Sequence, residues 1–93
     1  MSTIQEYTQM VRGLFPANAE ISVTVEEFEE ETTLGFSVTV QEDPDNVVCL
    51  SPRKLVKVRE KMKATYFFIY PRPTVSPDKI RIYIHAVIYH DHD

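Results

Sequence analysis

The chain has 93 residues, enough for one small domain over residues 1–93 and too few for a second one. Hydrophobic residues make up 43% and charged residues 26%, which is typical of a soluble globular domain, and no apolar run reaches the roughly 18 residues of a membrane span. One cysteine excludes an internal disulfide, and with only two glycines neither a phosphate-cradling loop nor a dinucleotide fingerprint can be written.

The two halves of the chain differ strongly in charge. Residues 1–50 hold ten acidic residues against one basic residue, whereas residues 51–93 hold nine basic residues against four acidic ones. The halves therefore carry −9 and +5 within a net charge of −4. Such asymmetry indicates either a dipolar surface that meets a charged partner or charges that pair within the fold, and the sequence leaves both open.

A first helix is predicted to begin near Ile4. Its apolar residues share one helical face: Ile4, Tyr7, Met10, Val11 and Leu14. Ser2 or Thr3 can cap its N-terminus, and Gly13 and Pro16 mark its end.

Two strands are predicted next, at residues 21–26 and 34–40, because apolar and polar residues alternate in both. The acidic connector 27–33 suits a hairpin loop, and residues 41–46 have the composition of a turn.

Ser51 and Pro52 predict the start of a second helix, with Leu55, Val58 and Met62 as its buried stripe. The opposite side of this helix is basic, with Arg53, Lys54, Lys57 and Lys61. Strands are predicted at residues 64–70 and 79–89, joined by a proline-rich link.

The order helix, strand, strand thus occurs twice, which predicts an α+β fold of two helix-hairpin units (αββαββ). We expect a four-stranded antiparallel sheet with both helices on one face. The predicted core contains Ile21, Val23, Val25, Leu34, Phe36, Val38, Leu55, Val58, Met62, Ile82 and Ile84.

The predicted outer face of this sheet is aromatic, which is typical of a partner or oligomer interface. It carries Tyr66, Phe68, Tyr70, Tyr83, His85, Val87 and Tyr89, with the bases Lys63, Arg72, Lys79 and Arg81 nearby. The alternative is that a loop, residues 71–78, covers this face.

Several residues carry groups that could ligate a metal or take part in catalysis. His90, His92 and their neighbouring aspartates could ligate a metal, but the end of a chain is usually frayed. His85 lacks a nucleophile at a suitable spacing, and Cys49 lies in an apolar stretch that predicts a buried thiol. We therefore expect no enzyme, no cofactor and no metal site.

Two binding surfaces remain. The first is acidic and resembles phosphates in its charge: Glu26, Glu27, Glu29, Glu30, Glu31, Asp43 and Asp45, with Glu42. The second combines bases and rings, as a single-stranded nucleic-acid platform does: Arg53, Lys54, Lys57, Lys61, Tyr66, Tyr83 and Tyr89. Solvated surface charge explains either set equally well.

In size, acidity and lack of catalytic motifs, the chain resembles the small phage-encoded anti-CRISPR inhibitors of type I surveillance complexes. The resemblance implies a non-enzymatic protein that docks on a multisubunit, RNA-guided complex and blocks target DNA. The element order differs from that of the RNA-recognition module, which alternates strand-helix-strand-strand-helix-strand.

We expect, first, an inhibitory protein-binding module that blocks nucleic-acid access to a host defence complex through the acidic and aromatic surfaces. Its partner would be a multisubunit protein or ribonucleoprotein complex of the bacterial cytoplasm, with contact to bound RNA possible and no membrane involved. The alternative is a small module that binds single-stranded nucleic acid through the basic second helix and the aromatic sheet face.

Overall fold

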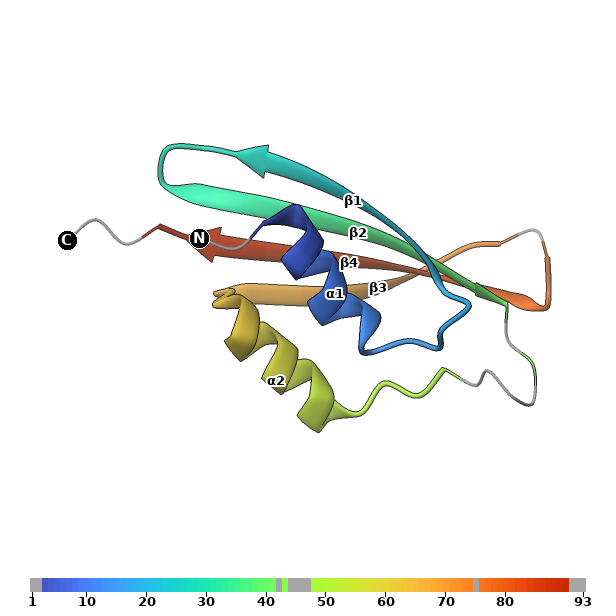
Figure 1. Ribbon diagram of the computed structural model, residues 1–93. Coiled ribbons are helices and arrows are strands. Elements are labelled where there is room, and N and C mark those ends of the chain that lie inside the picture. The colour runs from blue at the N-terminus through green and yellow to red at the C-terminus, as the bar shows by residue number, and fades with distance from the viewer. Residues whose placement is uncertain (1–2, 42, 44–47, 75, 91–93) are drawn as a thin grey trace.

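The computed structural model of the chain, shown in Figure 1, describes residues 3–41, 43, 48–74 and 76–90. The elements in chain order are α1 (Ile4–Arg12), β1 (Glu20–Glu27), β2 (Glu31–Gln41), α2 (Pro52–Met62), β3 (Tyr66–Arg72) and β4 (Lys79–Tyr89). The prediction of an α+β domain with two helices and a four-stranded antiparallel sheet is confirmed.

The helix ends follow the capping residues. At α1, the Thr3 hydroxyl accepts from the Glu6 backbone N–H at 3.2 Å, and the Glu6 carboxylate accepts from the Thr3 N–H at 3.2 Å, which completes a capping box. At α2, Ser51 is the N-cap but its side chain makes no capping hydrogen bond, while Lys63 ends the helix in the left-handed conformation, with φ at 61°.

Neither helix is long and apolar enough to cross a membrane, within the residues described.

The strand order in the sheet is β1-β2-β4-β3, and every neighbouring pair is antiparallel. The hairpin between β1 and β2 is tighter than predicted, because Glu27 still pairs with Thr32 and the Phe28 N–H donates to the Glu31 carbonyl at 2.8 Å. Strand β3 begins later than predicted and extends through Pro71 to Arg72. The proline is tolerated because β3 is an edge strand.

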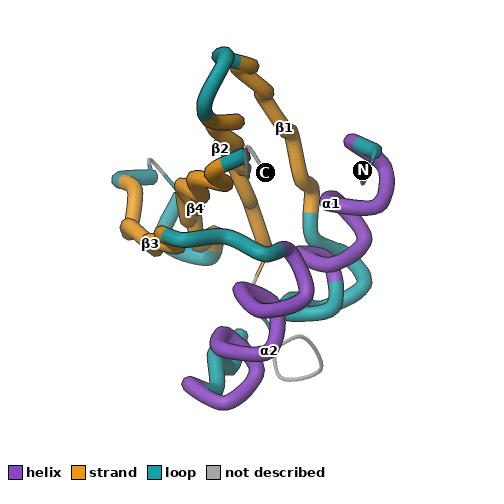
Figure 2. Tube along the Cα trace, turned by 90° about the vertical axis from the view of Figure 1, so that its left-hand side faces the viewer, coloured by secondary structure: helices purple, strands orange, loops and turns teal. Residues whose placement is uncertain are grey.

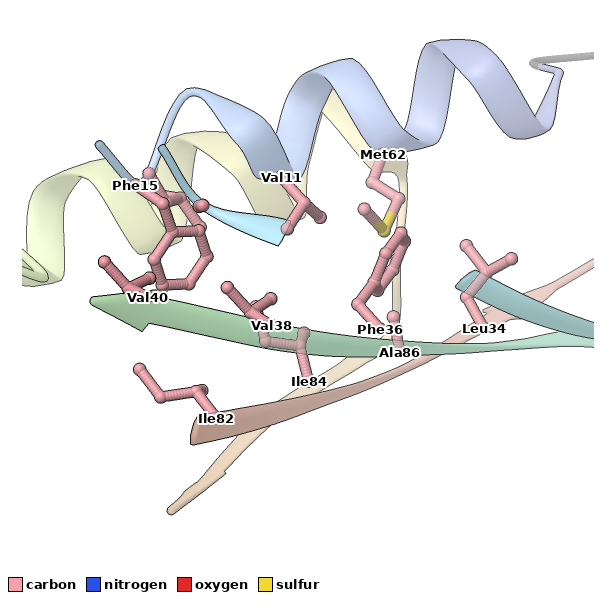
Figure 3. Packing of buried hydrophobic residues seen from close by; sticks show 12 residues of the cluster. Val11, Phe15, Leu34, Phe36, Val38, Val40, Met62, Ile82, Ile84 and Ala86 are labelled. Atoms are coloured by element: carbon pink, nitrogen blue, oxygen red, sulfur yellow. The ribbon is translucent and has the colours of Figure 1, made fainter. Parts of the chain in front are cut away.

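The core lies between the helices and one face of the sheet. In Figure 3, Val11 and Met62 from the helices point toward Phe36 and the neighbouring strand residues. Six members of the predicted core are buried as expected: Leu34, Phe36, Val38, Met62, Ile82 and Ile84. Five are only partly buried, because β1 is an edge strand and α2 reaches the core mainly through its last turn: Ile21, Val23, Val25, Leu55 and Val58. The predicted core lacked six buried members: Val11, Leu14, Phe15, Ala19, Val40 and Ala86.

The view in Figure 2 is turned by 90° and shows the strands on one side and the two helices on the other. The opposite face of the sheet, which we call the open face, has no helix over it. The odd-numbered residues of β4 lie on the open face. The even-numbered residues of β3 pair with them and lie on the same face.

Replacing the buried Ile84 by alanine is expected to lower the free energy of unfolding by about 2–5 kcal/mol, because the substitution leaves a cavity between the layers. The same substitution at Ile4, which is 52% exposed on α1, is the matched control and is expected to cost less than about 0.5 kcal/mol. Urea unfolding followed by circular dichroism measures both. Equal losses would show that Ile84 does not face the core.

Candidate binding face

A row of large side chains crosses the open face. Tyr66, Phe68 and Tyr70 of β3 are 46%, 45% and 48% exposed, and Tyr89 of β4 is 50% exposed. The alternative that residues 71–78 cover this face is therefore wrong for these four side chains. We call these four residues the aromatic row.

The aromatic row is continuous. The Tyr66 ring stacks on Phe68 with centroids 5.9 Å apart, and Phe68 lies 6.3 Å from Tyr70. Tyr66 also meets Tyr89 edge to face at 6.1 Å, which links β3 to β4. These separations lie within the range in which aromatic rings attract one another, so the rings support each other in position.

One end of the aromatic row meets the acidic hairpin, which we define as Glu26, Glu27, Glu29, Glu30 and Glu31. Glu31 pairs directly with Tyr89 across β2 and β4. Desolvation, followed by the charges of Tyr66 and Glu31, raises the pKa of the Tyr89 phenol. The acidic hairpin therefore joins the aromatic row through Glu31, whereas Glu27 borders a hollow beside Ile4 and Tyr7 of α1.

His90 holds the hairpin against the end of β4. Its backbone N–H donates to the Glu30 carbonyl at 2.9 Å. Its ring Nδ1 lies within 3.3 Å of the Glu29 carbonyl, which can only accept, and its Nε2 lies 2.6 Å from the Thr32 hydroxyl. From the sequence, His90 was predicted only as a candidate metal ligand. In the structure, the contacts of His90 hold the hairpin in position.

The predicted acidic surface is not a single patch. Asp43 lies beyond the other end of β2, an 11-residue strand that spans about 35 Å. Asp45 lies outside the described residues. Glu42 also lies outside them. The five glutamates of the acidic hairpin share one hairpin, but Glu27 borders a hollow beside α1 there.

The predicted basic and aromatic residues are also divided between two layers. Arg53, Lys54, Lys57 and Lys61 are exposed on α2, in the helical layer (Figure 1), whereas Tyr66, Tyr83 and Tyr89 lie on the sheet. Lys61 borders a hollow beside α1 instead. A nucleic acid lying on the open face would not meet the basic side of α2.

The other end of the open face has its own bases. Arg72 and Arg81 pair across β3 and β4, and the Arg72 guanidinium lies 4.8 Å from the centre of the Tyr83 ring. Tyr83 in turn lies over Gly35 of β2, where a side chain would meet the tyrosine hydroxyl and, at 2.9 Å, the Thr24 hydroxyl. The sequence did not predict this role of Gly35, although a glycine inside a strand is a known sign of close approach.

The remaining chemical candidates do not gather into a site. Cys49 is exposed, so the predicted buried thiol is wrong: its neighbours Val48 and Leu50 pack against the core, and the side chain between them faces solvent. His85 is half-buried and stacks on Tyr83 at 6.5 Å. Among the described side chains, no group of three His, Cys, Asp or Glu could hold a metal ion, and His92 falls outside them.

Comparison of the chain with protein-family models, with curated proteins and with solved structures gives no match.

The two glycines offer a matched pair of substitutions. Gly35→Ala is expected to lower the free energy of unfolding by about 1–3 kcal/mol, because the added methyl group displaces the Tyr83 ring. Gly13→Ala is expected to change stability little or to raise it by up to about 1 kcal/mol, because Gly13 has φ at −63° and room for a methyl group.

Thermal and urea unfolding of both variants, and of Gly35→Ala combined with Tyr83→Phe, measures the effect. Removing the Tyr83 hydroxyl is expected to recover part of the loss. If the cost of Gly35→Ala is unchanged in the Phe background, the hydroxyl does not occupy this space.

Proposed function

We propose that this protein is a non-enzymatic inhibitor that docks on a basic surface of a partner and thereby blocks nucleic acid from reaching it. The docking surface is the acidic hairpin together with the aromatic row. In this proposal the chain consists of two helix-hairpin units whose helices share one face of the sheet, which frees the other face for the partner.

The observation that carries the proposal is the junction of the two surfaces at Tyr89. Its ring contacts Tyr66 of the aromatic row at 6.1 Å, and its strand position is opposite Glu31 of the acidic hairpin. A partner that covers the rings therefore also meets Glu31. Interfaces commonly have this composition, with aromatic anchors at the centre and charged residues around them.

The charge of the hairpin indicates the kind of partner. Five carboxylates gathered at one end of the sheet attract lysines and arginines, which are the groups that hold the phosphates of nucleic acid. A protein that occupies such a groove excludes the nucleic acid by competition. This is the mode of action of an anti-CRISPR inhibitor in the bacterial cytoplasm, with a multisubunit, RNA-guided defence complex as the partner.

The partner is identified by capture from bacterial lysate on the full chain, followed by mass spectrometry. The proposal requires that the captured complex binds DNA or RNA and that this binding falls when the chain is added, as measured by gel shift. A captured protein without a nucleic-acid site would contradict the proposal.

Changing Glu29, Glu30 and Glu31 together to glutamine is expected to weaken binding to that complex about tenfold, since three exposed ion pairs contribute about 0.5 kcal/mol each. The affinity of the unchanged chain is also expected to fall as salt rises. Biolayer interferometry at several salt concentrations measures both effects.

The matched control changes Lys54, Lys57 and Lys61 of α2 to glutamine. It removes the same number of charges from the helical layer and is expected to leave the affinity unchanged within about twofold. If the glutamate variant binds as tightly as the unchanged chain and salt has no effect, competition through the acidic hairpin is wrong.

A further inference from the structure

The basic end of the open face contains a pocket of about 340 Å³. It is bordered mainly by Ser37 of β2, Arg72 and Pro73 at the end of β3, and Arg81 and Tyr83 of β4. The register explains this grouping, because Ser37 pairs with Tyr83 and Arg81 pairs with Arg72. A hydroxyl and two guanidinium groups thus border one hollow.

We propose that this pocket binds a phosphate group. Neither guanidinium forms an ion pair with a carboxylate of the described residues. Arg81 donates one N–H to the Pro73 carbonyl at 3.4 Å, which leaves its other donors for a ligand. Two arginines beside a hydroxyl match the charge and the acceptor atoms of a phosphate, since guanidinium groups bind phosphate oxygens in pairs.

The surroundings hold Arg72 in place before a ligand arrives. Its guanidinium stacks on Tyr83 at 4.8 Å, and Tyr83 lies in the space left by Gly35. A side chain that is already ordered loses less conformational entropy on binding. This stack is a second observation, independent of the charge, that distinguishes the pocket from an ordinary basic surface.

The carboxylates at this end of the sheet are outside the lining of the pocket as described. Asp78 accepts a hydrogen bond from the Gln41 amide at 3.2 Å. Glu20 of β1 pairs with Thr39 of β2, which pairs with Arg81 of β4. The backbones of Glu20 and Arg81 are therefore two strand spacings apart, about 10 Å. The acidic hairpin lies at the other end of β2. Asp43 follows β2 at the same end as the pocket. Among the residues that line the pocket itself, the charged side chains are Arg72 and Arg81, although the whole chain carries −4.

The phosphate has two sources that share this chemistry: a free phosphate ion, or the backbone of a nucleic-acid strand such as one held by the partner. For a strand, the aromatic row leads away from the pocket, because Tyr70 is two residues from Arg72 on the same face of β3. Bases would stack on these rings while a phosphate occupies the pocket. The net negative charge makes the binding weak in the isolated chain and strongly dependent on salt.

The test is a titration of the isolated full chain at low ionic strength, followed by NMR spectra of its backbone amides and arginine side chains. The probes are inorganic phosphate and an oligothymidylate of about ten nucleotides, each compared with potassium chloride at the same ionic strength. We expect phosphate to shift the signals of Ser37, Arg72, Arg81 and Tyr83 beyond the chloride control. If either probe shifts these signals no more than chloride does, the proposal is overturned.

The two sources give different patterns. With a strand as the natural ligand, the oligonucleotide binds more tightly than phosphate and its shifts extend to Tyr70 and Phe68. With free phosphate as the ligand, both probes shift the pocket alone. Either pattern supports the phosphate pocket.

Arg72→Gln and Arg81→Gln are each expected to weaken phosphate binding about tenfold, the loss of one charge-assisted hydrogen bond. Both residues are exposed, so the variants are expected to fold. Tyr83→Leu is expected to weaken binding several-fold without changing any charge, because Arg72 loses its stacking partner. Arg53→Gln on α2 is the control.

If Arg53→Gln weakens phosphate binding as much as Arg81→Gln does, the attraction comes from the overall charge and the pocket is not a site. Because the titration uses the isolated chain and a small anion, its result is separate from the partner experiment. The partner experiment can contradict the inhibitor proposal while the titration supports phosphate binding by the pocket, and the opposite combination of results is also possible.

Discussion

The pairing of β2 with β4 is the interaction on which the rest of the structure depends. Eleven residue pairs join the two strands, and these are the only two strands with a neighbour on both sides in the four-stranded sheet described. The pairing places Phe36 beside Ile84 in the core and, on the other face, Glu31 beside Tyr89 and Ser37 beside Tyr83. A shift of one residue would turn every one of these side chains to the opposite face.

This register also explains how the charges are arranged. The glutamates of the acidic hairpin lie at one end of the central pair, and Arg72 and Arg81 lie at the other. Glu20, Asp43 and Asp78 also lie at this second end. The helices lie over the opposite face of the sheet (Figure 2).

Local patterns in the sequence predicted much of the fold. Strict alternation in β2 and β4 predicted both strands and their inner faces, because side chains on a strand point to alternate sides. The capping residues located the start of each helix. The aromatic residues of β3 and β4 were assigned to the outer face for the same reason.

Properties that depend on strand order could not be read in this way. The alternation of β1 resembles that of β2, yet Ile21, Val23 and Val25 remain half-exposed because β1 lies at the edge. The space that Gly35 leaves for Tyr83 requires the register between β2 and β4. The separation of the α2 bases from the aromatic row requires the packing of the two layers, and no local pattern encodes it.

The distribution of aromatic residues gives the open face an optical signature. The chain has five tyrosines and no tryptophan, and four of the tyrosines belong to this face: Tyr66, Tyr70, Tyr83 and Tyr89. Ultraviolet fluorescence of the unlabelled protein therefore originates mainly there, with Tyr7 of α1 as the remaining source. A molecule that settles on the open face alters this emission directly, so the protein reports on its own occupancy without a dye.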